Sequence, residues 1–194
     1  DWVEVATLNY ELDDSDALAF LSASDEVAVN ADGSVIAVGD RFYDTGGTSS
    51  AGAVIIYERP GSSWNTGLNP APVARLVASD ATANRYLGSS VVMTGTTVVA
   101  GAYNGDAFYV FEEPGGGWAS GTESARVTLP ASGVDHRVAI DGDRIAVAHG
   151  SGAYVYTRNG ASWLLEQTLS GAQGPAVALS GDTVIARNEV FTYD

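Results

Sequence analysis

The feature that most constrains the fold is a pattern that occurs four times along the chain. In each unit two short apolar runs flank a Gly turn and a third run follows. The runs before the turns are at 26–32, 90–95, 137–142 and 176–181, those after the turns at 34–40, 97–103, 144–150 and 183–189, and the third runs at 52–58, 106–112, 152–158 and 189–194. Short segments rich in Val, Ile and aromatic residues, bounded by Gly, Asp and Asn, predict β-strands.

A fourth run follows a Trp in the first three units, after Trp64, Trp118 and Trp163. The inner runs are nearly continuous in apolar residues, as in strands covered on both faces, whereas the later runs mix apolar and polar positions. Four-stranded antiparallel sheets around an axis meet both conditions. The sequence therefore predicts an all-β fold, a four-bladed β-propeller. A sandwich of sixteen short strands fits the composition but does not explain the repeat.

The two ends of the chain predict how the ring closes. The last unit stops at Asp194 without a fourth run, but residues 1–8 ("DWVEVATL") have the same Trp-then-apolar pattern and end in Thr-Leu, as residues 166–169 do. An N-terminal strand in the last sheet would cover an edge that otherwise invites aggregation. We therefore expect one domain over 1–194, with blades at about 26–78, 88–130, 137–170 and 175–194 plus 1–8.

Charge narrows the possible partners. The chain has 24 acidic and 9 basic residues, all nine of them Arg, for a net charge of −15. Such a surface repels phosphates and anionic lipid, and no apolar stretch reaches the ~20 residues of a membrane span, so we expect neither nucleic-acid binding nor membrane insertion. Adaptation to high salt or recruitment of divalent cations is one interpretation, and an ordinary acidic surface is the other.

Two further features bear on the compartment. The chain has no Cys, which excludes disulfides and thiolate metal sites but leaves the redox compartment open. It begins at Asp1 rather than Met, which we interpret as a processed or excised product whose signal peptide, if it had one, has already been removed. We expect a secreted or cell-surface location for the mature chain.

The second unit carries a family resemblance. Leu87-Gly88-Ser89-Ser90-Val91 precedes a Gly turn, "TVVAGA" (97–102) and "AFYVFE" (107–112), and Gly-rich sequence with Trp118 follows. This resembles the FG-GAP repeat of bacterial and archaeal extracellular proteins, related to the integrin α-subunit propeller. Leu87-Gly88 stands where Phe-Gly is usual, and only Gly101-Ala102 keeps the Gly-Ala. The resemblance, weakest in the fourth unit, implies an adhesive or ligand-binding propeller, lectin-like in some members and seldom an enzyme.

Integrin-like blades often carry a calcium loop, and its equivalents here are short. The turns at 30–34, 94–96, 141–144 and 180–183 are too short to supply six oxygen ligands and read most simply as hairpin turns. The segment "YELDDSDA" (10–17) is a better candidate, because Asp13, Asp14 and Asp16 share one loop. A solvated acidic loop is the simpler interpretation. No cofactor other than calcium is expected.

One rim of the predicted propeller gathers most recognition groups. It holds the loops between second and third strands and the residues that enter each inner strand. The candidate ligand-binding residues are Asp40, Arg41, Tyr43, Asp44, Arg85, Tyr86, Tyr103, Asn104, Asp106, His136, His149 and Arg187. Tyr, Arg and Asn are typical of sugar or peptide recognition, although exposed loops are polar in most proteins. The periodic Trp residues are more typical of packing between blades than of ligand stacking.

Catalysis has little support in the sequence, and we assign no catalytic residue. Asp135-His136 beside Arg137 offers a general base, but neither Gly-x-Ser-x-Gly nor His-Glu-x-x-His occurs. The separation of paired glycosidase carboxylates is not readable from sequence. We expect a binding module for a glycan or a surface protein. A structural component of a cell-surface or viral coat assembly is the alternative, a carbohydrate-active enzyme is less favoured, and the oligomeric state is open.

Overall fold

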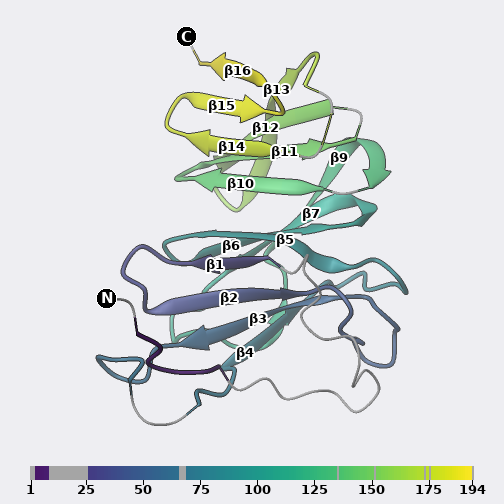
Figure 1. Ribbon diagram of the computed structural model, residues 1–194. Coiled ribbons are helices and arrows are strands. Elements are labelled where there is room, and N and C mark those ends of the chain that lie inside the picture. Colours follow the sequence, from purple (N-terminus) through teal and green to yellow (C-terminus); the bar gives the residue numbers. More distant parts are fainter. Residues whose placement is uncertain are drawn as a thin grey trace.

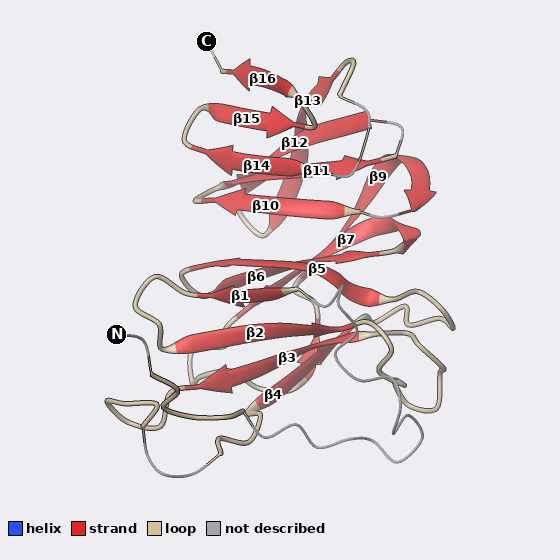
Figure 2. Cartoon of the chain, in the orientation of Figure 1, coloured by secondary structure: helices blue, strands red, loops and turns tan. Residues whose placement is uncertain are grey.

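The computed structural model describes residues 3–8, 26–65, 69–134, 136–150, 152–172, 174 and 176–193. These residues form strands, turns and loops and include no helix (Figure 2). The strands make four separate sheets, which lie face to face in chain order (Figure 1). The all-β prediction is therefore confirmed for the described residues.

The first two sheets hold the first nine strands. The first sheet contains β1 (Val27–Val29), β2 (Val35–Asp40), β3 (Ala53–Glu58) and β4 (Ala74–Val77), with the short β8 (Gly121–Thr122) parallel to β4. The second contains β5 (Leu87–Thr94), β6 (Thr97–Ala102), β7 (Asn104–Glu112) and β9 (Ala125–Val134). All pairings other than β4 with β8 are antiparallel.

The remaining two sheets are antiparallel throughout. The third contains β10 (Arg137–Asp141), β11 (Arg144–His149), β12 (Gly152–Asn159) and β13 (Ser162–Leu169). The fourth contains β14 (Val177–Ser180), β15 (Thr183–Ala186) and β16 (Glu189–Thr192). Among the described residues the fourth sheet thus has three strands, one fewer than the second and third.

A repeated two-residue turn sets the register of the last three sheets. Gly95, Gly142 and Gly181 each follow the first strand and have φ between 53° and 55°. A left-handed Gly is what the tight turns of twisted hairpins require, and each of these turns closes on directly paired neighbours. The three turns therefore align the last three sheets residue by residue.

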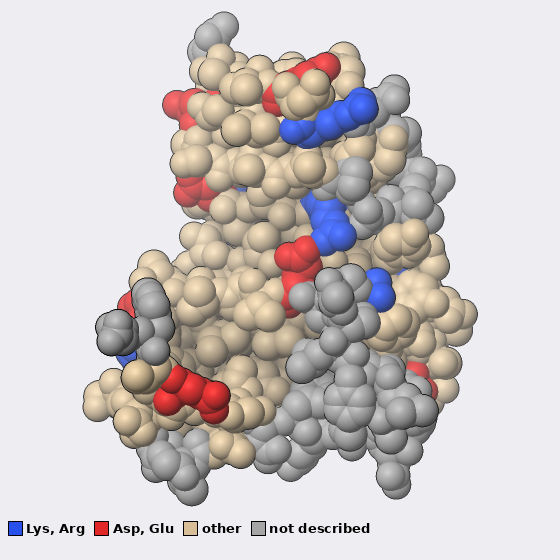
Figure 3. Space-filling model, viewed as in Figure 1, with Lys and Arg blue, Asp and Glu red and all other residues tan. Residues whose placement is uncertain are grey.

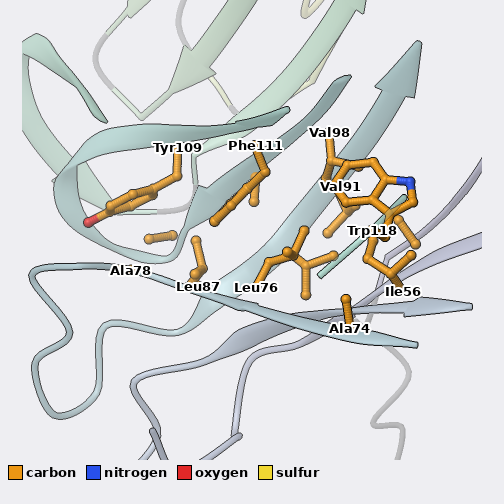
Figure 4. Packing of buried hydrophobic residues seen from close by; sticks show 14 of the residues in the cluster. Ile56, Ala74, Leu76, Ala78, Leu87, Val91, Val98, Tyr109, Phe111 and Trp118 are labelled. Atoms are coloured by element: carbon orange, nitrogen blue, oxygen red, sulfur yellow. The ribbon is translucent and has the colours of Figure 1, made fainter. Parts of the chain in front are cut away.

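Apolar side chains fill the spaces between successive sheets. Figure 4 shows the layer between the first and second sheets, where Leu76, Leu87, Tyr109, Phe111 and Trp118 pack together. A second cluster joins the second and third sheets and a third joins the third and fourth. Trp118 and Trp163 are buried in these layers, which confirms the packing interpretation for both.

Two glycines allow the sheets to touch through their backbones. A Cβ built on Gly39 in β2 would lie 1.9 Å from the carbonyl oxygen of Gly88 in the second sheet. One on Gly101 in β6 would lie 2.4 Å from the carbonyl oxygen of His136, which precedes the third sheet. Gly39 and Gly101 are at the same position of their sheets, paired with Val54 and Phe108 respectively. Only a residue without a side chain fits there.

The structure does not confirm the predicted closed ring. Residues 3–8 form no strand, and Leu8 packs against the cluster of Val38, Ala53, Ile55 and Tyr57 on the outer face of the first sheet. The first and fourth sheets lie at opposite ends of the stack, with the C-terminus at one end and the N-terminal segment at the other (Figure 1). The four sheets thus form an open stack, and residues 3–8 lie beside the first sheet and not along β16.

Candidate functional site

The loop between β2 and β3 is held against the residues that enter β5. The backbone N–H of Asn84 donates to the carbonyl of Ser49 at 2.9 Å, and that of Tyr86 donates to the carbonyl of Ser50 at 3.1 Å. Ser50, Asn84 and Tyr86 all have positive φ, between 48° and 60°. Left-handed backbone at non-Gly residues is uncommon and clusters at binding sites, which marks this part of the rim.

Three aromatic rings form a continuous row on this rim, and we call Phe42, Tyr86 and Tyr103 the aromatic row. Phe42 and Tyr86 meet edge to face with ring centroids 5.7 Å apart, and Tyr86 and Tyr103 do so at 6.3 Å. The guanidinium of Arg41 lies 4.6 Å from the centroid of Phe42. Tyr103 is 39% exposed, so the row opens to solvent at this end.

Amide groups flank the exposed end of the row. The Nδ2 of Asn104 donates to the carbonyl of Asn84 at 2.9 Å, and the Tyr86 hydroxyl donates to the Oδ1 of Asn84 at 3.2 Å. The structure thus brings Arg41, Tyr86, Tyr103 and Asn104 together, four of the residues that the sequence predicted. Rigid aromatic rings beside adaptable amides are a combination found in recognition surfaces.

Asp40 and Asp44 shape the loop instead of facing outward. The Oδ1 of Asp44 accepts the backbone N–H of Ser50 at 2.7 Å, and the Oδ1 of Asp40 accepts that of Phe42 at 3.2 Å. Burial raises the pKa of Asp40 above its ordinary value. Tyr43 packs against the apolar outer face of the first sheet. These three predicted site residues therefore support the loop that carries Phe42.

Arg85 and Asp106 belong to a charge network beside the row. Asp80 lies 3.3 Å from Arg85 and 2.9 Å from Arg126, and Asp106 lies 3.5 Å and 2.6 Å from the same two guanidinium groups. The Tyr109 hydroxyl donates to Asp80 at 2.8 Å. Burial opposes ionisation of Asp80, but hydrogen bonds from Tyr109 and Arg126 bring its pKa below the ordinary value. The network joins the loop before β5 to β7 and β9.

Both histidines lie inside the protein, between the second and third sheets. His136 and His149 are 0% exposed, and their rings meet edge to face at 5.8 Å. The His149 ring stacks on Tyr154 at 5.4 Å, and burial lowers the pKa of His149. The sequence predicted two ligand-binding groups here, but His136 immediately precedes β10 and His149 ends β11, and both side chains are buried. At these positions the imidazoles pack and do not face solvent.

Of the remaining predicted residues, the structure describes only Arg187, which lies away from the aromatic row. Arg187 is exposed at the turn before β16, in the fourth sheet, with φ of 58°. Asp13, Asp14 and Asp16 lie outside the described residues, as does Asp135. Among the residues that the structure does describe, no group of three or more His, Asp or Glu is placed to hold a metal ion.

Sequence reasoning missed Phe42, which joins Arg41 to the two tyrosines. Phe42 has no polar group to mark it as a recognition residue, although it stands between two predicted residues in the same loop.

On the face shown in Figure 3, basic side chains form small separate groups. No helix among the described residues is long and apolar enough to cross a membrane.

Comparison with solved structures places the fold. The chain superposes on the periplasmic gluconolactonase PpgL of Pseudomonas aeruginosa with a TM-score of 0.57 and 13% identity, over 89% of this chain and 54% of that one. It superposes on Hsv2 of Kluyveromyces marxianus with a TM-score of 0.50 and 10% identity, over 74% of this chain and 44% of that one. Both are β-propellers, so the likeness shows a propeller fold. The chain spans about half the length of each.

Sequence comparison gives one assignment. Comparison with curated protein sequences finds no match. Residues 71–117 match the FG-GAP repeat, and they include the loop before β5, the hairpin β5–β6, β7 and the approach to Trp118. The Gly88 and Gly101 backbones that touch neighbouring sheets lie inside this stretch. The resemblance seen in the second unit is therefore confirmed: the chain carries an FG-GAP repeat at residues 71–117, in a fold of the β-propeller type.

Proposed function

We propose that this protein is an extracellular ligand-binding and adhesion module that recognises carbohydrate through the aromatic row. The observation that carries the proposal is the row itself, three rings in edge-to-face contact at one rim, with Tyr86 at its centre on left-handed backbone. Aromatic side chains offer apolar faces to the C–H groups of a sugar, and the Tyr hydroxyls can bond its oxygens. FG-GAP repeats are typically extracellular, which supports a secreted or cell-surface location.

The surroundings of the row supply the polar half of a sugar site. Asn84 and Asn104 lie at the exposed end near Tyr103, and Arg41 lies at the opposite end, against Phe42. Amide and guanidinium groups orient hydroxyls around a stacked ring, as in other binding sites that join an apolar surface to a few polar groups. The bonds that fix Asn84 and Tyr86 through the 49–50 backbone hold these groups in place before ligand arrives.

The experiment is a glycan-array screen at low and high salt, each with and without calcium, followed by affinity measurements on the best glycan. Tyr103→Ala should weaken binding at least about tenfold, equivalent to about 1.4 kcal/mol. Tyr193→Ala is the matched control, because Tyr193 is 60% exposed and follows β16, away from the row. Equal binding by the two folded variants would remove the aromatic row from the proposal.

A second candidate is a structural component of a surface assembly. The observation that favours it is an apolar strip on the exposed face of the fourth sheet, where Ile185 and Val190 are 45% and 65% exposed. A folded protein that binds no glycan in any of the four array conditions would shift the weight to this candidate.

A further inference from the structure

The outer face of the fourth sheet matches a face that is covered elsewhere in the molecule. Ala178, Ile185 and Val190 are cross-strand neighbours and form one apolar row on this face. Ile185 and Val190 are 45% and 65% exposed. Counting from the Gly142 and Gly181 turns, the equivalent row of the third sheet is Ala139, Ala146 and Val155, at 9%, 0% and 7% exposure. The fourth sheet covers that row, so its own row is a surface on which a next sheet would pack.

The first sheet presents the complementary face. Val27 in β1 is 63% exposed and Val29 is 57% exposed. Val27 pairs with Val38 across the first hairpin of its sheet. The equivalent pairs are Val91 with Ala100 in the second sheet and Val138 with Val147 in the third. Val91 and Val138 are 2% and 4% exposed, because the preceding sheet covers each of them. The first sheet thus exposes the side that its counterparts bury against a preceding sheet.

The N-terminal segment resembles the strand that the fourth sheet lacks. Residues 1–8 ("DWVEVATL") align with β13 ("SWLLEQTL") and share its Trp, Thr and final Leu. Leu129 in β9 and Leu169 in β13 each pack into the layer shared with the following sheet. Leu8 packs on the first sheet in the same way. Leu8 therefore lies where the last residue of a fourth strand would lie in a sheet preceding the first, although residues 3–8 form no strand there.

A groove at β16 has room for such a strand. It has a volume of about 550 Å³ and lies between β13 and the edge of the fourth sheet. Leu169, Val184 and Phe191 line its apolar part. At its polar end Arg144 lies 2.5 Å from Asp182 and 3.3 Å from Glu166. Among the described residues no strand pairs with the outer edge of β16.

We propose that the occupant of both surfaces is a second copy of this chain. The fourth sheet of one copy packs on the first sheet of the other, and residues 3–8 of that other copy extend the fourth sheet along β16. This contact repeats the sheet-on-sheet packing already present three times within the chain. Made twice, this contact closes the two stacks of four sheets into a ring of eight sheets.

The first test is the mass of the protein in solution, by light scattering after size exclusion at 0.1 M and 1 M NaCl. We expect twice the 20.0 kDa of one chain, with the dimer favoured at high salt because each copy carries −15. Val190→Glu should raise the dimer dissociation constant at least tenfold by placing a charge in the apolar row. Leu164→Glu is the control, since Leu164 is 48% exposed on β13, outside the proposed contact. A 20 kDa species at both salt concentrations, or a dimer indifferent to Val190→Glu, would overturn the proposal.

The second test distinguishes two copies from closure within one chain. Val155 pairs with Gln167 across β12 and β13, so the equivalent pair is Val190 with Ala6 of the incoming strand. The chain has no Cys of its own, so every disulfide formed in Ala6→Cys with Val190→Cys involves only the two introduced residues. Oxidation should yield a covalent dimer on a denaturing gel, and Ala6→Cys with Leu164→Cys should not. A disulfide inside a single 20 kDa chain would show that the ring closes without a partner and refute the second copy.

Discussion

The backbone contact between Gly39 and Gly88 makes Gly39→Ala the sharpest test of how the sheets pack. The added methyl would lie 1.9 Å from the Gly88 oxygen and 2.8 Å from its carbonyl carbon. Carbon–oxygen contacts normally keep about 3.3 Å, so the strands would have to separate by more than about 1 Å. Overpacking costs about 1–3 kcal/mol where side chains can give way. Here backbone must move, and we expect about 3 kcal/mol.

Thermal unfolding followed by circular dichroism measures this cost. For a chain of this size about 1 kcal/mol corresponds to roughly 2–4 °C, so Gly39→Ala should melt roughly 6–12 °C below the wild type. Gly116→Ala is the control, because no atom lies within 4 Å of its added Cβ and its φ is not positive. It should melt within about 2 °C of the wild type. A Gly39→Ala protein that melts with the control would show that the two sheets do not approach through these glycines.

Three further predictions concern charge and protonation. Asp80→Asn should destabilise the protein by about 1–2 kcal/mol in urea unfolding, because Arg85 and Arg126 lose their shared negative charge and one of the two carboxylate oxygens becomes an NH2 group that cannot accept a hydrogen bond. Partial exposure of Asp80 keeps the loss below that of a fully buried pair, and an unchanged stability would show that the network is dispensable. Burial lowers the pKa of His149 in the folded state, so the unfolded chain takes up the proton more readily once the pH falls below its unfolded-state pKa of about 6.5. The contribution of the neutral, buried imidazole to stability is therefore fully present above that pH and is lost as the pH falls further. The drop in melting temperature from pH 7 to pH 5 should then be smaller in His149→Asn than in the wild type, and an equal drop would assign acid sensitivity elsewhere. Finally, the melting temperature should rise between 0.1 M and 1 M NaCl, as the Debye length shrinks from about 10 Å to about 3 Å around a chain of charge −15; a constant value would contradict adaptation to salt.

Strands and turns were predictable because they depend on local patterns. Alternation of apolar runs with Gly turns identified all the inner hairpins, since Gly142 and Gly181 must take a left-handed conformation whatever surrounds them. The FG-GAP resemblance was readable for the same reason, because its Gly residues are required by close contact between backbones. The small β8, which adds in parallel to β4, has no comparable signal in two residues of sequence.

The candidate site was only partly predictable. Loop positions told us that Arg41, Tyr86 and Tyr103 lie on one rim, but not that Phe42 joins them into a row. His136 and His149 looked like rim residues, yet their side chains turn into the layer between two sheets. The direction of a side chain at a strand end depends on the twist of its sheet and on the neighbour packed against it, and neither is written in the local sequence.

The sequence by itself determined the units: which residues form strands, where they turn, and that one unit lacks a strand for which residues 1–8 have the matching pattern. Only the tertiary structure decided how those units are arranged. Side-chain packing in each layer, such as the one around Trp118 and Phe111, fixes how successive sheets stack. The stack ends at the first and fourth sheets, which leaves Val27 and Val190 exposed where the inner sheets bury the equivalent residues.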